Sequence, residues 1–255
     1  MNFNELFSEK EKEVIKTISD KIISLEAEQK QRTAEWFEAR RGKFSASKIK
    51  DLISCDRKTA KLPLSDPAKI IGIGEVAKKY IYKTAKERQY YRVPTATTWA
   101  MNFGTENEKV IKKILSEKYD FEFEEVGFIY DNEKKVGASP DGLNDDFVLE
   151  MKSPTSWETY MDRTEKEFDR KHQDFWQVQT QMLVAGKDRC LYVVALPPDE
   201  DYNIDDVFIK VILPDEEAQN FIIERAKLGE KIIEKYLNEK IKFDEVVEKC
   251  CRTFF

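Results

Sequence analysis

The segment PDGLNDDFVLEMK, residues 140–152, constrains the fold more than any other part of this sequence. Side chains of a β-strand alternate between its two faces, so Glu150 and Lys152 share one face and Met151 takes the other. Asp141 lies upstream, at the end of a preceding strand. The pattern predicts two neighbouring strands that are partly buried and that bring two carboxylates and an ammonium together.

Helices and strands are expected to alternate around this segment. Helical periodicity predicts helices around Trp36 and over residues 99–119, 156–168, 175–185 and 215–238, and apolar runs predict strands at 121–130, 134–143, 146–154, 191–197 and 207–214. The first three strands are expected to form an antiparallel meander, and Glu106 and Glu108 to lie in the first turn of their helix. This order predicts an α/β fold, a central mixed β-sheet flanked by helices.

The length of 255 residues predicts one domain over 1–255, with a helical extension over about residues 1–34. No apolar run is long enough to span a membrane, and the acidic start of the chain is unlike a signal peptide, so a cytoplasmic location is expected. The net charge of −6 gives no overall attraction to nucleic acid, so any contact with DNA has to be local. The single histidine, His172, rules out a metal site built on two histidines, and we expect it at the surface.

The residues Asp141, Glu150 and Lys152 suit hydrolysis of a phosphodiester. Carboxylates and water hold Mg²⁺, which polarises the phosphoryl group and acidifies a bound water. A neighbouring lysine orients or deprotonates that water and stabilises negative charge. The alternative for so short a pattern is a solvated hairpin with a cross-strand salt bridge.

Further motifs follow one another in order along the chain. They are Trp36 with Arg40, Ser45-Ala46-Ser47, Gly104-Thr105 with Glu108, Ser139-Pro140-Asp141-Gly142, Leu149-Glu150-Met151-Lys152 and Gln177-Val178-Gln179. With these motifs the chain resembles the phage lambda-type exonucleases, also called the YqaJ-like viral recombinase family, which have a PD-(D/E)xK nuclease core. The resemblance covers about residues 36 to 196.

The resemblance implies roles for the residues at these positions. It assigns Glu108, Asp141 and Glu150 as ligands of Mg²⁺ or Mn²⁺, with the main-chain carbonyl of Met151 also near a metal. It assigns Lys152 as the catalytic lysine.

Two assignments stay open within the resemblance. Glu106 competes with Glu108, which fits the spacing Gly-x-x-x-Glu of the family. Gln177 or Gln179 matches a glutamine that positions the lysine or the attacking water. Helical geometry puts Gln177 and Gln181 on one face and Gln179 on another.

The resemblance also implies that Arg40, Ser47 and Ser139 hold the 5′-phosphate left after each cut. Hydroxyls, a helix N-terminus and the fork of an arginine together suit an anion.

The function implied is 5′-to-3′ digestion of linear double-stranded DNA, which leaves 3′ single-stranded overhangs for recombination by strand annealing. The implied partners are DNA ends, a single-strand annealing protein and further copies of the chain in a ring of three. A phage or prophage gene expressed in a bacterial cytoplasm is implied as well. The rivals are an endonuclease with the same metal site and a DNA-end-binding protein whose nuclease core has decayed.

Overall fold

The computed structural model describes residues 31, 33–91, 99–196, 207–239 and 241–255. The extension predicted over residues 1–34 lies almost entirely outside this part of the chain, and the single-domain organisation stays a prediction. None of the described helices combines the length and the apolar character that crossing a membrane requires.

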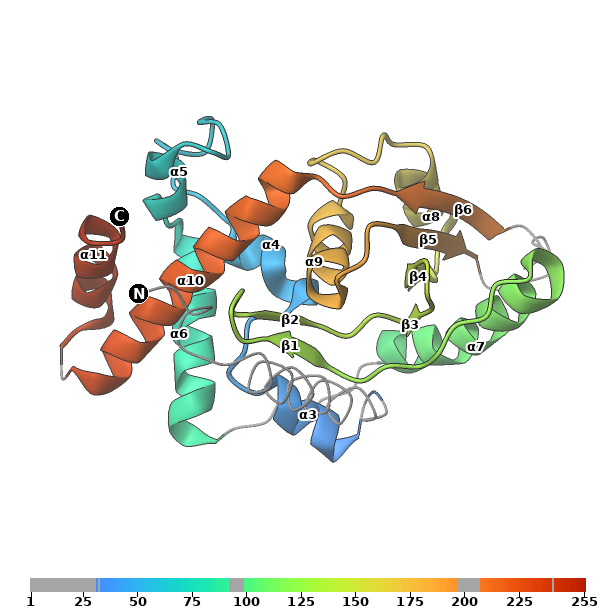
Figure 1. The fold of residues 1–255 in the computed structure, drawn as a ribbon, viewed down its shortest axis with the longest axis horizontal. Coiled ribbons are helices and arrows are strands. Elements are labelled where there is room, and N and C mark those ends of the chain that lie inside the picture. Colours follow the sequence, from blue (N-terminus) through green and yellow to red (C-terminus); the bar gives the residue numbers. More distant parts are fainter. Residues whose placement is uncertain (1–30, 32, 92–98, 197–206, 240) are drawn as a thin grey trace, which may run out of the picture.

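A mixed four-stranded sheet forms one half of the molecule, as the sequence predicts (Figure 1). The strands are β3 (Gly142–Leu143), β4 (Val148–Lys152), β5 (Cys190–Ala195) and β6 (Val207–Ile212), in this order across the sheet. The central pair β4 and β5 is parallel, and the two outer pairs are antiparallel. Two parallel central strands need a crossover connection, which helices α8 (Trp157–Thr164) and α9 (Phe175–Ala185) provide.

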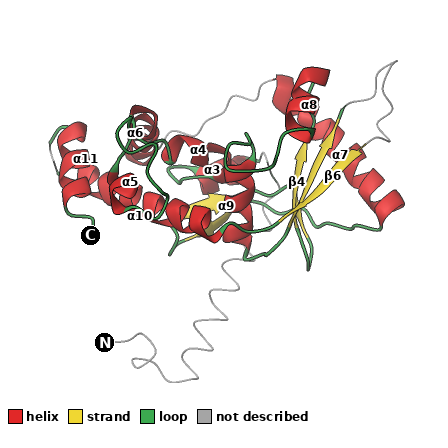
Figure 2. Cartoon of the chain, turned by 90° about the horizontal axis from the view of Figure 1, so that it is seen from above, coloured by secondary structure: helices red, strands yellow, loops and turns green. Residues whose placement is uncertain are grey.

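Helices cover both faces of this sheet. Helix α7 (Trp99–Tyr119) packs Ile111 and Leu115 against Leu149 and Met151 of β4 on one face. Helix α9 packs Val178 and Met182 against the opposite face of β4 and β5. Figure 2 shows α7 and α8 close to the ends of the strands. The period-two alternation of β4 therefore decides that Glu150 and Lys152 belong to the α9 side.

The predicted position of Glu106 and Glu108 in the first turn of their helix is wrong. Helix α7 begins at Trp99, so both residues lie well inside it. A glycine inside a helix costs about 1 kcal/mol relative to alanine, which does not suffice to end the helix at Gly104.

Both antiparallel pairings of the predicted meander are confirmed, but its middle strand is not continuous. Strands β1 (Ile129–Asp131) and β2 (Val136–Ala138) form a separate two-stranded sheet, and the run expected as one strand over 134–143 divides at Ser139-Pro140. On one side of the division, Gly137 donates its N–H to the carbonyl of Phe44 at 2.9 Å. On the other side, the N–H of Asp141 reaches the carbonyl of Leu149 at 3.0 Å. Pro140 has no N–H for a ladder, so the chain changes partners there.

The remaining helices form the other half of the molecule (Figure 1). They are α3 (Ala34–Arg40), the 3₁₀ helix η1 (Ala46–Lys48), α4 (Ile49–Leu52), α5 (Pro67–Ile71), α6 (Glu75–Tyr90), α10 (Glu216–Asn238) and α11 (Phe243–Arg252). Helix α11 follows the last helix that the sequence predicts, over 215–238, and was not expected. Val246, Val247 and Cys250 of α11 are buried, and so few apolar residues make a weak signal in the sequence.

Candidate functional site

Glu150 is the buried centre of the candidate site. Its side chain projects from the middle of β4 toward α9, and the residue is 2% exposed. Gln177 donates its Nε2 to Oε1 of Glu150 at 2.7 Å, and Gln181 donates its Nε2 to Oε2. Lys152 forms an ion pair with the same carboxylate. These contacts satisfy a buried charge that would otherwise be costly.

Lys152 lies between three oxygen-bearing side chains. Besides Glu150, its Nζ lies 3.3 Å from Oε1 of Gln177 and 4.0 Å from Oδ1 of Asp174. Burial lowers the pKa of Lys152, but the negative charges of Glu150 and Asp174 outweigh it and raise the pKa above its ordinary value. Lys152 is therefore a cation held beside Glu150.

Asp141 stands next to Glu150 on the neighbouring chain segment. Its Oδ2 accepts the N–H of Met151 at 2.6 Å, which fixes the carboxylate against β4. Burial raises the pKa of Asp141 well above its ordinary value, and so do the charges of Glu150 and Glu108. The structure thus brings three carboxylates into electrostatic range of one another, from β4, α7 and the loop before β3.

These carboxylates do not enclose a metal ion as they stand. Within the described ranges, no three Asp, Glu, His or Cys side chains form a group that could hold one. The reason is that Glu150 is committed to Gln177, Gln181 and Lys152 on the α9 side, whereas Glu108 approaches on α7, which covers the other face.

The donor set nevertheless fits a hard divalent cation. Asp141, Glu150 and Glu108 supply carboxylate oxygens, the ligand type that Mg²⁺ prefers. Their mutual repulsion, seen in the raised pKa of Asp141, is what a cation would relieve. Oε1 of Gln181 is buried without a hydrogen-bond partner in the described part of the chain, so the polar surroundings of Glu150 are incompletely satisfied.

Gln179 does not belong to this cluster. It donates its Nε2 to the carbonyl of Leu213 at 2.9 Å, and its Oε1 accepts the N–H of Asp215 at 2.8 Å. Gln179 thereby ties α9 to the start of α10. Gln177 and Gln181, one helical turn apart, both face Glu150.

Asp174 is a site neighbour that the sequence analysis missed. It is 6% exposed, and its Oδ2 accepts hydrogen bonds from Oη of Tyr192 at 2.7 Å and from Nε of Arg163 at 3.1 Å. The charged segment before α9 contains several acids, and nothing in its pattern distinguishes this one. Only the packing of α8, β5 and α9 brings these side chains together.

The expectation that His172 lies at the surface is wrong. It is 3% exposed, and its Nδ1 accepts the N–H of Asp174 at 3.2 Å. The other ring nitrogen, Nε2, therefore carries the proton and faces the carbonyl of Arg163 at 3.2 Å. Burial lowers the pKa of His172, which keeps the ring neutral. His172 braces the turn that carries Asp174.

The three residues assigned to a phosphate come together from three segments. Arg40 donates its Nη1 to Oγ of Ser139 at 3.3 Å and its Nη2 to Oγ of Ser47 at 3.2 Å. Trp36 also donates its Nε1 to Oγ of Ser139 at 2.9 Å, and the Arg40 guanidinium lies 4.1 Å from the centroid of the Trp36 ring. The buried Trp36 thus holds both Arg40 and Ser139.

A cavity of about 290 Å³ opens beside Arg40. Most of its charged lining is positive. The lining residues are Trp36, Phe37, Arg40, Arg41, Lys43, Ser45, Ser47, Lys48, Tyr80, Lys83 and Glu87. Burial lowers the pKa of Arg40, yet a guanidinium stays protonated at neutral pH. The cavity therefore suits an anionic group.

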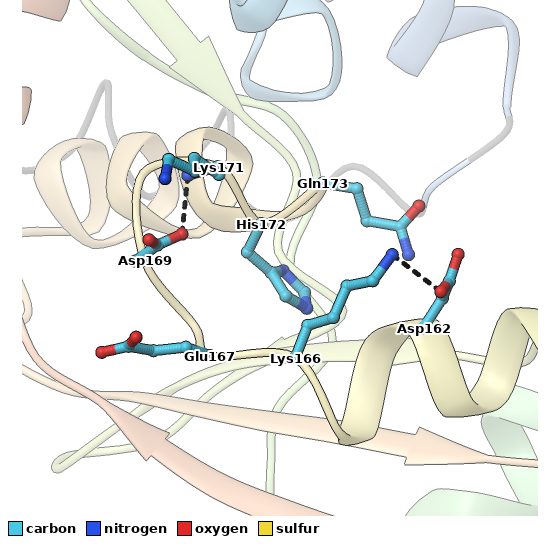
Figure 3. A pocket seen from close by; sticks show the side chains of 7 residues that line it. All are labelled: Asp162, Lys166, Glu167, Asp169, Lys171, His172 and Gln173. Carbon is cyan, nitrogen blue, oxygen red and sulfur yellow. Dashed lines mark hydrogen bonds and ion pairs between the residues drawn. The ribbon is translucent and has the colours of Figure 1, made fainter.

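A second cavity, of about 300 Å³, contains none of the predicted site residues (Figure 3). Its lining mixes both signs of charge. The lining residues are Asp162, Lys166, Glu167, Asp169, Lys171, His172 and Gln173. His172 links this cavity to the site, since its ring bonds to the main chain of Asp174.

Comparison with known proteins gives a family match and similar solved structures. The family model described as YqaJ-like viral recombinase domain matches residues 35–188. A crystal structure of LHK-Exo in complex with dAMP has a TM-score of 0.64 and 25% identity, covering 86% of this chain and 99% of that chain. A structure of the alkaline exonuclease LHK-Exo from Laribacter hongkongensis has a TM-score of 0.63 and 24% identity over the same shares, 86% and 99%.

A phage-related exonuclease from Haemophilus somnus 129PT shares the fold, with a TM-score of 0.63 and 16% identity, covering 78% of this chain and 96% of that chain. A comparison with curated proteins gave no match.

The raised pKa of Asp141 predicts a measurable effect on stability. A pKa that is higher in the folded than in the unfolded protein contributes stability below the unfolded value, about 3.9, and this stability is lost as the pH rises through the folded value. Asn cannot ionise, and its oxygen can still accept the N–H of Met151. In EDTA at pH 8, Asp141→Asn should therefore unfold at a higher temperature than wild type. Its free energy of unfolding should be larger by on the order of 1 kcal/mol for each unit by which the pKa of Asp141 is raised in the folded protein.

The advantage of Asp141→Asn should shrink as the pH falls toward 5. Thermal unfolding followed by circular dichroism measures it, with Asp146→Asn as the control, because Asp146 is an exposed acid between β3 and β4. An Asp141→Asn variant that is no more stable than wild type at pH 8 would contradict the electrostatic account.

Proposed function

The chain belongs to the YqaJ-like viral recombinase domain family, and from that premise we propose that it is a metal-dependent exonuclease that digests one strand of linear double-stranded DNA from the 5′ end. One observation carries the proposal. The acidic cluster of Asp141 and Glu150 lies next to the held cation Lys152, and Ser139, two residues before Asp141, is already bonded to Arg40 in a cationic cavity.

The acidic cluster would hold Mg²⁺ or Mn²⁺. Asp141, Glu150 and Glu108 would supply carboxylate oxygens, with the carbonyl of Met151 as a further candidate. When bound, such an ion polarises the scissile phosphoryl group and lowers the pKa of a coordinated water.

Lys152 and Gln177 act on the attacking water in this proposal. The ammonium of Lys152 and the amide of Gln177 already contact each other and Glu150, so both can orient a water on that side of the site. Attack of the water breaks the P–O3′ bond and releases a nucleoside 5′-monophosphate. That the similar LHK-Exo was solved with dAMP, a molecule of this class, supports the assignment.

Arg40, Ser47 and Ser139 would hold the 5′-phosphate of the strand being cut. Arg40 presents two N–H groups to the two hydroxyls, an arrangement that an arriving phosphate can take over. Because Ser139 and Asp141 are close in sequence, a phosphate held by Ser139 has a defined distance from the metal ligands. The cavity would thereby set the register of each cut.

The resemblance to the lambda-type exonucleases supports a proposal for the partners. Digestion from 5′ ends leaves 3′ single-stranded overhangs, which suit a single-strand annealing protein in recombination. A ring of three copies around the DNA, in the cytoplasm of a bacterial host, completes the proposal.

The deciding experiment uses linear duplex DNA labelled separately at each 5′ and 3′ end, beside covalently closed circular DNA. Wild type should release 5′ label as mononucleotides in Mg²⁺, leave the circle intact and do nothing in EDTA. Lys152→Ala should lose activity by about a thousandfold or more, on the scale of removed catalytic groups. Cleavage of the circle would identify an endonuclease, and DNA binding without cleavage by wild type would identify a decayed nuclease.

The two glutamines of α9 offer a matched pair of variants. Gln177→Ala removes the partner of both Glu150 and Lys152, so kcat should fall by about ten- to a hundredfold. Gln179→Ala leaves the site side chains in place but deprives Leu213 and Asp215 of their partner, which should cost about 1–3 kcal/mol of stability. Steady-state kinetics and thermal unfolding of both proteins measure the contrast, and the opposite pattern would refute it.

The phosphate assignment predicts a preference among DNA ends. Wild type should digest 5′-phosphorylated duplex about ten- to a hundredfold faster than 5′-hydroxyl duplex, because charge-assisted hydrogen bonds contribute roughly 1.5–3 kcal/mol each. Arg40→Ala should lose most of this preference and keep the slow reaction on hydroxyl ends. Lys58→Ala is a suitable control, since Lys58 is an exposed cation outside the cavity lining. Equal wild-type rates on both ends would overturn the assignment.

A further inference from the structure

We propose that Asp174 is a positioning residue for Lys152: its carboxylate holds the Lys152 ammonium in the site while Glu150 binds a metal ion. This inference rests on the proposed function, because it concerns how the same site works once a cation is bound.

The starting point is the competition for Glu150. Its two carboxylate oxygens accept hydrogen bonds from Gln177 and Gln181 and form an ion pair with Lys152. A divalent cation that takes these oxygens competes directly with the ammonium of Lys152 and repels it. Lys152 then needs another anion, because an unpaired buried ammonium is strongly destabilised.

Asp174 is the acid placed to serve as that anion. Its Oδ1 lies 4.0 Å from Nζ of Lys152, on the α9 side of the sheet where Gln177 also contacts the ammonium. At 4.0 Å the Asp174 carboxylate attracts the ammonium, whereas Glu150 is its nearer partner. A small movement of the Lys152 side chain closes the gap.

The carboxylate of Asp174 is held so that Oδ1 stays turned toward the lysine. Tyr192 on β5 and Arg163 on α8 both donate to Oδ2, at 2.7 and 3.1 Å. The N–H of Asp174 is bonded to His172, which fixes its main chain. Burial and the neighbouring Asp174 raise the pKa of Tyr192, so its hydroxyl stays a donor. Because three segments of the chain restrain the Asp174 carboxylate, it can fix the position of the Lys152 ammonium as well as attract it.

Two nearby acids, Asp162 on α8 and Asp169 in the segment before α9, have other partners. Asp162 forms an ion pair with Lys166 at 2.7 Å, and Asp169 accepts the N–H of Lys171. Figure 3 draws both contacts as dashed lines. Asp162 is mostly exposed and takes no part in the contacts of Lys152. It is therefore a matched control for loss of one negative charge from this region.

The test compares Asp174→Asn with Asp162→Asn in the full chain. Asp174→Asn keeps the shape and the acceptor for Tyr192 but removes the charge, so kcat on linear duplex should fall about tenfold, while KM for DNA stays within about twofold. Calorimetric titration of the DNA-free protein with Mg²⁺ should give an affinity about tenfold weaker than that of wild type, because the ammonium displaced from Glu150 then lacks its second anion. Asp162→Asn should match wild type in all three measurements.

Two results would overturn the proposal: a kcat for Asp174→Asn equal to that of Asp162→Asn, or a Mg²⁺ affinity for Asp174→Asn equal to that of wild type. If Asp174→Asn does not fold, Tyr192→Phe is the variant to use, because it removes a hydrogen bond to the Asp174 carboxylate and leaves the charge in place. Its kcat should fall about threefold at unchanged Mg²⁺ affinity. An unchanged kcat would refute the positioning role of Asp174. Wild type that cleaves no DNA in Mg²⁺ would refute the proposed function instead.

Discussion

The burial of the Glu150 carboxylate between β4 and α9 is the constraint on which the site depends. A charge that is 2% exposed needs partners, and Gln177, Gln181 and Lys152 supply them. These partners fix the rotation of α9 about its axis, since two glutamines one turn apart must face the strand. The same contacts hold Lys152 in its position. The hydrogen bonds and the ion pair of Glu150 therefore stabilise the packing of α9 on the sheet and also place Lys152 and Gln177.

The site takes residues from helices on both faces of the sheet. Helix α9 contributes the glutamines from one face, and α7 carries Glu108 on the other. Burial and the charges of Glu150 and Glu108 disfavour the ionised form of Asp141, as its raised pKa indicates. The divalent cation of the proposed function would relieve this repulsion among the carboxylates.

The break in the chain at Ser139-Pro140 links this site to the cationic cavity. Upstream of the break, β2 packs against the helical half, where Gly137 donates its N–H to the carbonyl of Phe44. Downstream, Asp141 enters the sheet half. Ser139 lies at the junction and is bonded to Arg40. The two halves of the molecule are thus joined at the point where a DNA end and a metal would have to be brought together.

Local periodicity determined much of this protein from the sequence alone. The helix over 175–185, the mixed sheet flanked by helices and the shared face of Glu150 and Lys152 all follow from patterns a few residues long. Tertiary structure alone decided the break at Ser139-Pro140, the burial of His172 and the place of Asp174 beside Lys152. These depend on contacts between residues far apart in the chain, and a charged residue before a helix looks the same in sequence whether it faces water or a buried lysine.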